Sequence, residues 1–263
     1  MSLLEVEGLT KRFGGITAVD GLSFTIEEGE WVGLIGPNGS GKTTLFSLLS
    51  GVERPDGGQI RLDGRSLVGL DPAQIYHLGL VRGFQVPRLF SGMDVLENML
   101  VAEKDHPGET LAASLRPGRL EEAERLAARR AVRWLQSFGL AGVAGHLAPE
   151  LSGGQMKLLE AARTLMGDPR LLLLDEPAAG VAPALAREIF ERLDQLRREQ
   201  GITLLVIEHR LDLLFDYVDR VLVLHHGRLL ADGTPEQVAE DPRVIEAYFG
   251  NFRWGRRQEG ARS

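Results

Sequence analysis

A cluster of glycine, lysine and hydroxyl residues at positions 36–44 has the composition to bind phosphate. It follows the apolar run Trp31–Ile35 and precedes a stretch of helical character. Glycines let consecutive backbone N–H groups point at one anion, and the positive end of a helix dipole near Lys42 adds to the attraction. Every position of the P-loop pattern is filled, which argues against a turn that merely joins a strand to a helix. We therefore expect a nucleoside triphosphate here, with Lys42 on its β- and γ-phosphates and Thr43 on Mg²⁺. The nucleotide-binding residues expected in this segment are Gly36, Pro37, Asn38, Gly39, Ser40, Gly41, Lys42, Thr43 and Thr44.

Two carboxylates end an apolar run further along the chain. Leu171–Leu174 is typical of a strand buried on both faces, and Asp175 and Glu176 follow it directly. Ligands of open α/β sheets bind at the carboxyl ends of the strands. An acidic pair at a strand end is more often only solvated, but a P-loop in the same chain reverses that interpretation. We expect Asp175 to hold Mg²⁺, directly or through water, and Glu176 to be the general base for the attacking water.

A second anion site is indicated at residues 151–155, which read Leu-Ser-Gly-Gly-Gln. They precede the helical run Met156–Met166, so a serine and two glycines stand at a helix N-terminus. Backbone N–H groups and the helix dipole favour anions there. Taken alone, the segment fits equally a serine that only caps the helix.

Composition limits what else the chain can be. Its 263 residues are 43% apolar, enough for a sizeable core in one or two domains. Cysteine is absent, which excludes disulfides, thiol nucleophiles and zinc fingers. The 37 acidic and 30 basic residues give a net charge of −7, which argues against nucleic acid as a partner. No run of about 20 apolar residues suits a membrane span, and no signal peptide is evident, so we expect a soluble, intracellular protein.

Alternating strand-like and helical segments must position these residues, which predicts an α/β fold. Strands are expected at residues 22–26, 31–35, 59–62, 81–85, 171–174, 203–207 and 220–224. Helices are expected at residues 42–50, 94–103 and 119–138. The last of these carries Leu126, Val132 and Leu135 on its expected apolar side. Residues 94–150 therefore look like a helical insertion, after which the sheet resumes.

The P-loop, residues 151–155 as a signature loop, and an acidic strand end 20 residues beyond Gln155 together resemble the nucleotide-binding subunit of an ABC transporter. The resemblance covers roughly residues 3–250 and implies an ATPase coupled to transport. Its implied fold is an α/β P-loop NTPase cassette of ABC type, a mixed sheet with a β subdomain and a helical signature subdomain. The resemblance implies one domain at residues 1–250 and a C-terminal tail at residues 251–263. Within the domain, residues 1–93 and 165–250 form a RecA-like core with its β subdomain, and residues of about 94–164 form a helical subdomain.

The same resemblance implies a dimer in which two chains, identical or paralogous, assemble head to tail around ATP. Each ATP then lies between the P-loop of one chain and the signature loop of the other, where Ser152 and Gly154 contact its γ-phosphate. The nucleotide-binding residues implied in this loop are Ser152, Gly153, Gly154 and Gln155. Membrane-spanning permease subunits and a substrate-binding protein are the further implied partners, with this chain peripheral at the cytoplasmic face of the cell membrane.

Three more residues gain roles only from the resemblance. Phe13 matches the aromatic residue that stacks on adenine; otherwise it would be an ordinary core residue. Gln85 matches a glutamine that approaches Mg²⁺ and links the site to the membrane partner; otherwise it is a solvated strand end. His209 matches a histidine that binds the γ-phosphate and holds Glu176, and the other five histidines are expected at the surface. The implied catalytic residues are Glu176, His209, Gln85 and Lys42, and the implied metal ligands are Thr43, Gln85 and Asp175.

The chain departs from the family pattern at two positions. An Asp or Asn usually precedes the proline that follows the acidic strand end, whereas this chain has Ala182 before Pro183. A methyl group cannot make the polar contact across the dimer that is implied there. Met156 stands where Arg or Gln is commoner, and only a minor effect is expected.

The segment Arg82–Phe90 and the C-terminal stretches 233–237 and 244–250 are similar to the subgroup that energises branched-chain amino-acid uptake. Lipopolysaccharide-export ATPases share part of the C-terminal stretch and are the alternative within the fold. A soluble nucleic-acid-associated ABC ATPase is less favoured, because the chain has one P-loop, no sustained heptads and a negative charge. A P-loop kinase has no use for the signature loop.

Overall fold

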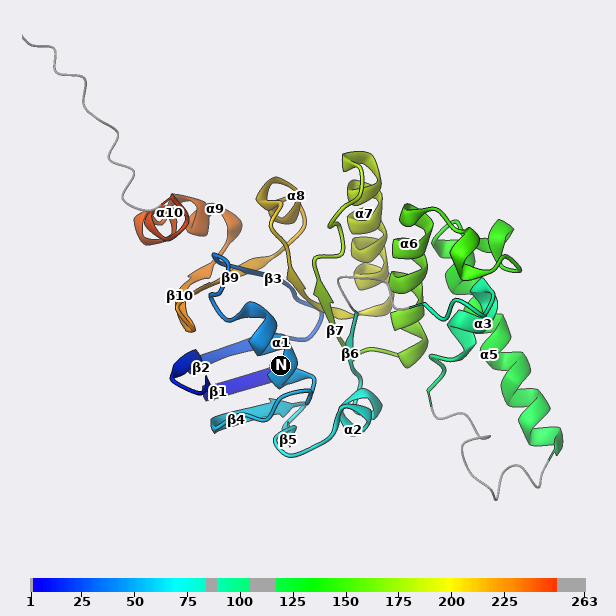
Figure 1. Ribbon diagram of the computed structural model, residues 1–263, viewed down its shortest axis with the longest axis horizontal. Coiled ribbons are helices and arrows are strands. Elements are labelled where there is room, and N and C mark those ends of the chain that lie inside the picture. Colours follow the sequence, from blue (N-terminus) through cyan, green and yellow to red (C-terminus); the bar gives the residue numbers. More distant parts are fainter. Residues whose placement is uncertain (1, 84–88, 105–116, 250–263) are drawn as a thin grey trace, which may run out of the picture.

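The computed structural model describes residues 2–83, 89–104 and 117–249 of the chain. Two sheets organise them (Figure 1). A six-stranded sheet has the order β10-β9-β3-β8-β7-β6, and a four-stranded sheet has the order β2-β1-β4-β5. In the larger sheet β9, β3, β8, β7 and β6 run parallel, and β10 pairs antiparallel with β9. The expected α/β fold with a mixed sheet is therefore confirmed.

The strands are β1 (Ser2–Phe13), β2 (Ile16–Glu27), β3 (Trp31–Ile35), β4 (Gly57–Leu62), β5 (Arg65–Ser66), β6 (Leu80–Arg82), β7 (Leu171–Asp175), β8 (Thr203–Ile207), β9 (Arg220–His225) and β10 (Arg228–Gly233). The α-helices are α1 (Lys42–Leu49), α2 (Pro72–His77), α3 (Val95–Leu100), α5 (Pro117–Ser137), α6 (Gly153–Thr164), α7 (Pro183–Gln200), α8 (Leu211–Phe215), α9 (Pro235–Glu240) and α10 (Pro242–Phe249). Short 3₁₀ turns are formed by Ala141–Val143, Ala148–Glu150 and Leu165–Gly167.

The central strands β3, β8 and β7 of the six-stranded sheet are buried on both faces, as the run Leu171–Leu174 shows. Leu172 and Leu174 pack into the core beneath α6 and α7, whereas Leu171 and Leu173 pack into the core that contains α1 and the four-stranded sheet. All four leucines are at most 4% exposed. Because alternate side chains of a strand point to opposite faces, an unbroken apolar run is what a covered parallel strand requires. The expectation of a doubly buried strand is confirmed.

The four-stranded sheet was only partly expected. Its strand β2 contains the predicted segment 22–26, but the twelve-residue strand β1 beside it was not predicted. Several register irregularities interrupt the pairing of β1 with β2. Bulges of this kind break the period-two alternation from which a strand is recognised in a sequence.

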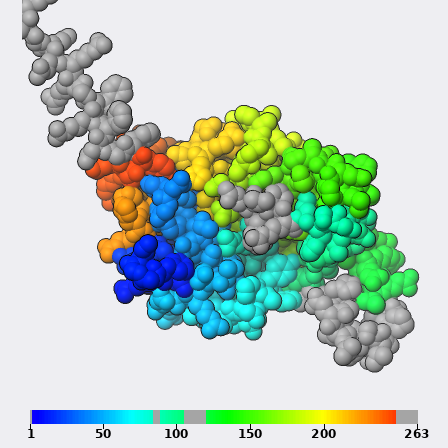
Figure 2. All heavy atoms as spheres, in the orientation of Figure 1, coloured from blue at the N-terminus to red at the C-terminus, as the bar shows by residue number. Residues whose placement is uncertain are grey.

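The helices α3, α5 and α6 lie together at one end of the molecule, with the C-terminal helices α9 and α10 at the opposite end (Figures 1 and 2). The expected long helix is confirmed as α5, and Leu135 is buried on its apolar side as predicted, but the prediction was wrong for Leu126 and Val132. Leu126 and Val132 are 55% and 38% exposed, whereas Ala127, Ala131 and Leu135 are buried. These last three recur at every fourth residue, which places them on one helix face. Small alanines allow close packing, so the buried face is not the one with the largest side chains.

The strand expected at residues 81–85 is present as β6, which ends at Arg82 in the described part of the chain; Gln85 lies outside the described residues. Among the helices of the described residues, none has the length and apolar character needed to cross a membrane.

Candidate functional site

The P-loop connects β3 to α1, and contacts from distant parts of the chain require its glycines. A Cβ atom on Gly36 would collide with the carbonyl oxygen of Leu224 in β9, and one on Gly41 would collide with that of Ala18 in β2. Gly41 also has φ +106°, in the region that favours glycine. The loop is therefore shaped by two sheets at once, which the local pattern alone did not reveal.

Lys42 begins α1 and is only 7% exposed. Its Nζ atom donates hydrogen bonds to the carbonyl oxygens of Gly36 and Pro37, at 2.7 and 3.1 Å. Burial lowers the pKa of Lys42, and the nearby carboxylates of Glu176 and Asp175 oppose that shift. A desolvated cation fixed at the start of a helix is an arrangement suited to phosphate.

Asp175 and Glu176 end β7 as expected, and their environments differ. Asp175 is 9% exposed, and burial raises the pKa of its carboxyl group, although the guanidinium of Arg82, 3.7 Å away, acts in the opposite direction. Glu176 has φ +51°, an unusual backbone conformation for a residue with a side chain. Its Oε1 atom lies 3.0 Å from Nε2 of His209, which follows β8. The carboxyl ends of two neighbouring strands thus bring the expected base and histidine into contact.

One cavity of about 450 Å³ joins the P-loop to this pair. It is lined by Ile16, Thr17, Ala18, Asn38, Gly39, Ser40, Gly41, Lys42, Thr43, Thr44, Glu176, Ile207, His209 and His226. Two parts of this lining were not predicted from the sequence. They are the residues of β2 and His226, which is in the turn between β9 and β10. His226 is exposed, as expected, but nothing in its neighbouring residues signals that the turn returns to the P-loop. There the N–H of Gly227 donates to the carbonyl oxygen of Ser40.

Phe13 ends β1 and is 45% exposed, so it is not a core residue. It pairs in register with Ile16, which lines the cavity, and the ammonium group of Lys11 lies 5.0 Å from its ring centroid. An exposed aromatic ring near a cavity is suited to stacking on a flat ligand. The structure thus places Phe13 next to the expected nucleotide site.

The signature loop lies at a different place, the N-terminus of α6. Ser152 is the N-cap: its hydroxyl accepts a hydrogen bond from the Gln155 N–H, and the Gln155 side chain accepts one from the Ser152 N–H, at 3.2 and 2.9 Å. This loop and Ala179–Ala182 line another cavity, of about 620 Å³, that shares no lining residue with the P-loop cavity. Within one chain, the two anion sites are not brought together.

Ala182 is the N-cap of α7, and no side-chain hydrogen bond caps that helix. Alanine is among the poorest N-cap residues. Pro183 at the first helical position compensates in part, because its ring fixes φ at a helical value and its missing N–H would have been unsatisfied there. The departure seen in the sequence is therefore also a departure in local structure.

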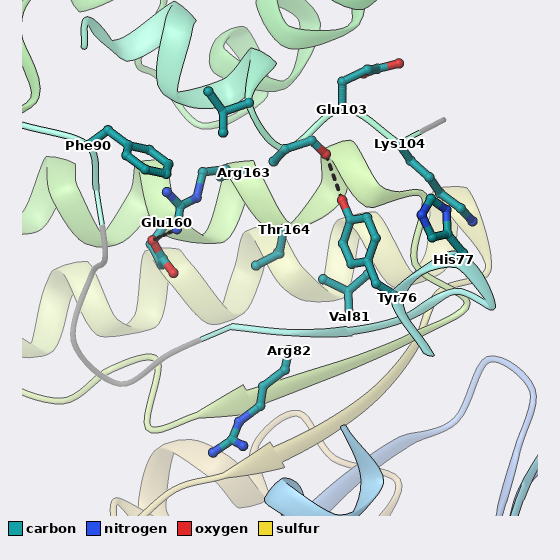
Figure 3. Close-up of a pocket in the computed structure, with 12 residues that line it drawn as sticks. Tyr76, His77, Val81, Arg82, Phe90, Glu103, Lys104, Glu160, Arg163 and Thr164 are labelled. Atoms are coloured by element: carbon teal, nitrogen blue, oxygen red, sulfur yellow. Dashed lines mark hydrogen bonds and ion pairs between the residues drawn. The ribbon is translucent and has the colours of Figure 1, made fainter. Parts of the chain in front are cut away.

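A groove of about 520 Å³ lies between β6 and the helical region (Figure 3). Tyr76, Phe90 and Arg163 line it, and the Tyr76 hydroxyl donates to the carbonyl oxygen of Ala102 at 2.7 Å. Burial, chiefly, raises the pKa of Tyr76 to about 12, so this hydroxyl keeps its proton. Arg82 also lines the groove and extends away from the other labelled side chains, toward Asp175. Arg82 therefore connects this groove to Asp175 at the end of β7.

Thr43 and Asp175 offer a hydroxyl and a carboxylate oxygen, the hard oxygen donors that Mg²⁺ prefers together with substrate phosphates. Across the described residues, no group of three or more His, Asp or Glu side chains could hold a metal by itself. The donor set therefore fits Mg²⁺ that arrives with a nucleotide better than a resident metal ion.

Comparison with known proteins agrees with this geometry. A family model described as "ABC transporter" matches residues 19–179, and one described as "Branched-chain amino acid ATP-binding cassette transporter" matches residues 228–251. The chain is 44% identical to the high-affinity branched-chain amino acid transport ATP-binding protein BraF of Pseudomonas aeruginosa, over 94% of this chain and 98% of that one. It is 40% identical to the probable branched-chain amino acid transport ATP-binding protein LivG of Methanocaldococcus jannaschii, over 95% and 98%.

Solved structures agree as well. A nucleotide-free ATP-binding cassette from an ABC transporter superposes with a TM-score of 0.82 at 39% identity, covering 95% of this chain and 100% of that one. The ADP conformation of the cassette MJ1267 superposes with a TM-score of 0.81 at 39% identity, over 95% and 99%. The chain belongs to the ABC transporter family, as an ATP-binding subunit that hydrolyses ATP.

Proposed function

We propose that this chain hydrolyses ATP to drive the uptake of branched-chain amino acids. The observation that carries the hydrolytic part is the contact between Glu176 and His209 at the wall of the cavity that contains the P-loop. The substrate is supported by the C-terminal match at residues 228–251 and by curated relatives that are named as branched-chain amino acid transport proteins. Both supports favour uptake over the lipopolysaccharide-export alternative.

Catalysis follows from the positions of five groups. The ammonium group of Lys42 and the P-loop N–H groups bind the β- and γ-phosphates, and Phe13 stacks on the adenine. Glu176 accepts the proton of the attacking water, and His209 shares its Nε2–H between the Glu176 carboxylate, which it positions, and an oxygen of the γ-phosphate. The positive φ of Glu176 aims its side chain into the cavity.

Thr43, Asp175 and Gln85 are the residues proposed to hold Mg²⁺ with the nucleotide. The metal ion would supply neutralisation of the developing charge on the transferred phosphoryl group. Burial and the adjacent Glu176 carboxylate both raise the pKa of Asp175, and a bound cation would favour its charged form.

A second chain completes the site. Because Ser152, Gly153 and Gly154 face a cavity separate from that of the P-loop, they and Gln155 beside them reach ATP only when another copy or a paralogue presents them. We therefore propose a head-to-tail dimer. A structural neighbour, 24% identical, is described as the dimeric post-hydrolysis state of the cassette MJ0796 bound to ADP and phosphate.

The groove of Figure 3 is the proposed contact with the membrane-spanning permease subunits. Arg82 and Phe90, which flank Gln85 in the sequence, line this groove, and Arg82 joins it to Asp175. In this arrangement the chain is peripheral at the cytoplasmic face of the membrane, a substrate-binding protein delivers the amino acid, and residues of about 94–164 form a helical subdomain on a core made of 1–93 and 165–250.

Copurification from solubilised membranes and reconstitution in vesicles test the proposal. The copurified permease subunits are reconstituted with this chain, and ATP-dependent accumulation of radiolabelled leucine is measured against the Glu176→Gln chain as the inactive control. We expect accumulation only with the unchanged chain, with Mg²⁺ present. ATP hydrolysis that persists in EDTA would contradict the site, and copurification with a lipopolysaccharide exporter would contradict the substrate.

A further inference from the structure

The guanidinium group of Arg82, the last residue of β6, is fixed by the helix that follows the P-loop. The side chain is only 12% exposed. Its Nη1 atom donates hydrogen bonds to the hydroxyl oxygens of Ser47 and Ser50, both at 3.3 Å. Its guanidinium carbon lies 5.8 Å from the ring centroid of Phe46. Phe46 and Ser47 belong to α1, and Ser50 is the C-cap of that helix, so contacts with α1 hold the charge of Arg82 inside the protein.

Another nitrogen of the same guanidinium group faces Asp175. The Nη2 atom lies 3.7 Å from Oδ2 of Asp175, whose side chain is 10% exposed. Strand pairing sets this approach, because Arg82 stands opposite Leu173 in the parallel register of β6 and β7, two residues before Asp175. Charges that are largely removed from water interact more strongly than charges at the surface. Loss of the guanidinium group would therefore leave the charge of the Asp175 carboxylate poorly compensated.

Mg²⁺ would need the same carboxylate. Asp175 is a proposed metal ligand together with Thr43, and the metal ion would arrive with the nucleotide. A guanidinium group and a divalent cation repel each other, so each lowers the affinity of Asp175 for the other. Lys42 is placed differently, because its ammonium group donates hydrogen bonds to two carbonyl oxygens of the P-loop. Arg82 is therefore the cation whose recorded ion pair competes with the metal ion.

We propose that Arg82 is a positioning residue that neutralises and holds Asp175 in the nucleotide-free chain and gives up this pairing when Mg²⁺ binds. This inference rests on the proposed function, in which Asp175 is a ligand of Mg²⁺. The pair of Arg82 and Asp175 stabilises the chain before the nucleotide arrives, and it lowers the affinity for the metal ion. Arg82 also lines the groove of Figure 3, so metal binding changes the charge that the chain presents at the proposed permease contact.

A double-mutant cycle on the nucleotide-free chain tests the pairing. Arg82→Met removes the counter-charge of a largely buried carboxylate, so Tm should fall by about 5 °C or more. In the Asp175→Asn background there is no charge to compensate, and the same substitution should lower Tm by less than half as much. Equal losses in the two backgrounds would overturn the proposal.

Arg130→Met is the matched control for this cycle. Arg130 pairs with Glu103 and Asp168, and none of these three residues lines the P-loop cavity. Arg130→Met should lower Tm equally with and without Asp175→Asn, because distant substitutions act independently. If Arg82→Met does not fold, Arg82→Gln replaces it, since a glutamine amide carries no charge and keeps a hydrogen-bond donor.

Metal dependence of nucleotide binding gives a readout that a merely structural role would not change. Calorimetry with a non-hydrolysable ATP analogue gives the ratio of Kd in EDTA to Kd with Mg²⁺. Arg82→Met should raise this ratio about tenfold, within the range of common coupling between sites, because the metal ion no longer displaces a cation. Arg130→Met should leave the ratio unchanged. An unchanged or lowered ratio in Arg82→Met would overturn the proposal.

The Asp175→Asn background separates the possible causes. There Arg82→Met should leave the ratio unchanged; a change would show that Arg82 acts on the nucleotide directly, and it would overturn the proposal. The unchanged chain must first bind the analogue more tightly with Mg²⁺ and lose that preference with Asp175→Asn. If it does not, the proposed metal site is wrong. If it does and Arg82→Met keeps the original ratio, only the role of Arg82 is wrong.

Discussion

The P-loop half-site and the signature half-site of this chain bind the same kind of ligand by opposite means. The P-loop is fixed by contacts with other parts of the chain. A carbonyl group of β9 leaves no room for a side chain at Gly36, and one of β2 leaves none at Gly41. Lys42 is buried and donates hydrogen bonds to backbone oxygens. The signature loop is an exposed helix end whose Ser152 and Gln155 satisfy each other. A Cβ atom on Gly153 would meet no other atom within 4 Å.

This difference shows which half is complete within one chain. The P-loop half is assembled by contacts between residues far apart in the sequence, and it already contains its base and histidine. The signature half is capped locally by Ser152 and Gln155 and has no chemical group that could break a bond. It gains a function only when it faces ATP held by another chain, so the two halves should respond differently to substitution.

The largest expected contrast comes from Glu176→Gln. Loss of a general base lowers kcat about a hundred- to ten-thousandfold. ATP binding should survive, because Lys42 and the P-loop are unchanged, and the variant should accumulate as an ATP-bound dimer. Phosphate release measures the first effect, and size-exclusion chromatography with ATP measures the second.

Glu191→Gln on the exposed face of α7 is the matched control and should behave as the unchanged chain does. Full turnover by Glu176→Gln would show that Glu176 is not the general base. The P-loop half would then not contain the catalytic group that distinguishes it from the signature half.

Ser152→Asp should separate capping from ATP recognition in the signature half. Aspartate is as good an N-cap as serine, and its charge suits a helix N-terminus, so the free chain should keep its stability. Against the γ-phosphate of the partner's ATP the same charge costs several kcal/mol, so ATP-driven dimer formation should weaken about a hundredfold. Ser152→Ala should instead lower the free energy of unfolding by about 1 kcal/mol.

Mixed dimers show on which site the substitution acts. When Glu176→Gln is placed in the Ser152→Asp chain, the one hydrolysing P-loop faces the altered signature loop, and activity should be lost. When Glu176→Gln is placed in the other chain, the hydrolysing P-loop faces an unchanged loop, and activity should be retained. An effect confined to the P-loop of the substituted chain itself would contradict the shared site.

Alanine substitution of one glycine in each half tests the difference in assembly. Gly41→Ala adds a methyl group that collides with the carbonyl of Ala18, at φ +106°, so it should cost about 2 kcal/mol or more. At about 2–4 °C per kcal/mol, Tm should fall by about 4–8 °C. Gly153→Ala meets open space in the first turn of α6 and should leave Tm unchanged or slightly raised. Equal losses in thermal unfolding would show that both loops are shaped by their surroundings.

The sequence predicted the parts of this fold whose signals are local. The four-leucine strand, the P-loop and the helix after the signature loop follow from runs and spacings within a few residues of one another. Strand β1 was missed because bulges interrupt its alternation, and the buried face of α5 was misassigned because alanines rather than the larger Leu126 and Val132 face the core. Packing between distant elements decides both features.

The candidate site divides in the same way. Lys42, Asp175 and Glu176 were expected from their own motifs, and the structure brings them together at one edge of the six-stranded sheet, beyond the carboxyl ends of β3 and β7. Contact between His209 and Glu176 was expected only from a family resemblance, and the approach of His226 to the P-loop was not expected at all. Strand order decides which loops meet, and nothing in the spacing of these residues encodes it.

The smallest expected effect is that of the buried Lys42 charge on thermal stability. Removing this side chain from the P-loop half should raise Tm, whereas removing the Ser152 cap from the signature half should lower it. Because burial lowers the pKa of Lys42 in the folded chain, its charge opposes folding in full at any pH below that folded pKa, where the side chain is protonated in both states. As pH rises through the folded pKa, the native state releases its proton first, the unfolded state binds more protons, and stability rises until the unfolded pKa is reached. Lys42→Met removes this cost, so without nucleotide it should unfold a few degrees above the unchanged chain at neutral pH, with a difference that shrinks in the alkaline range. Ser152→Ala should lower Tm without such a pH dependence, because no titrating group is changed. If Lys42→Met unfolded at a lower temperature than the unchanged chain, the hydrogen bonds from Lys42 to Gly36 and Pro37 would stabilise the fold by more than the buried charge destabilises it. The P-loop half would then be stable without ATP, as the signature half is.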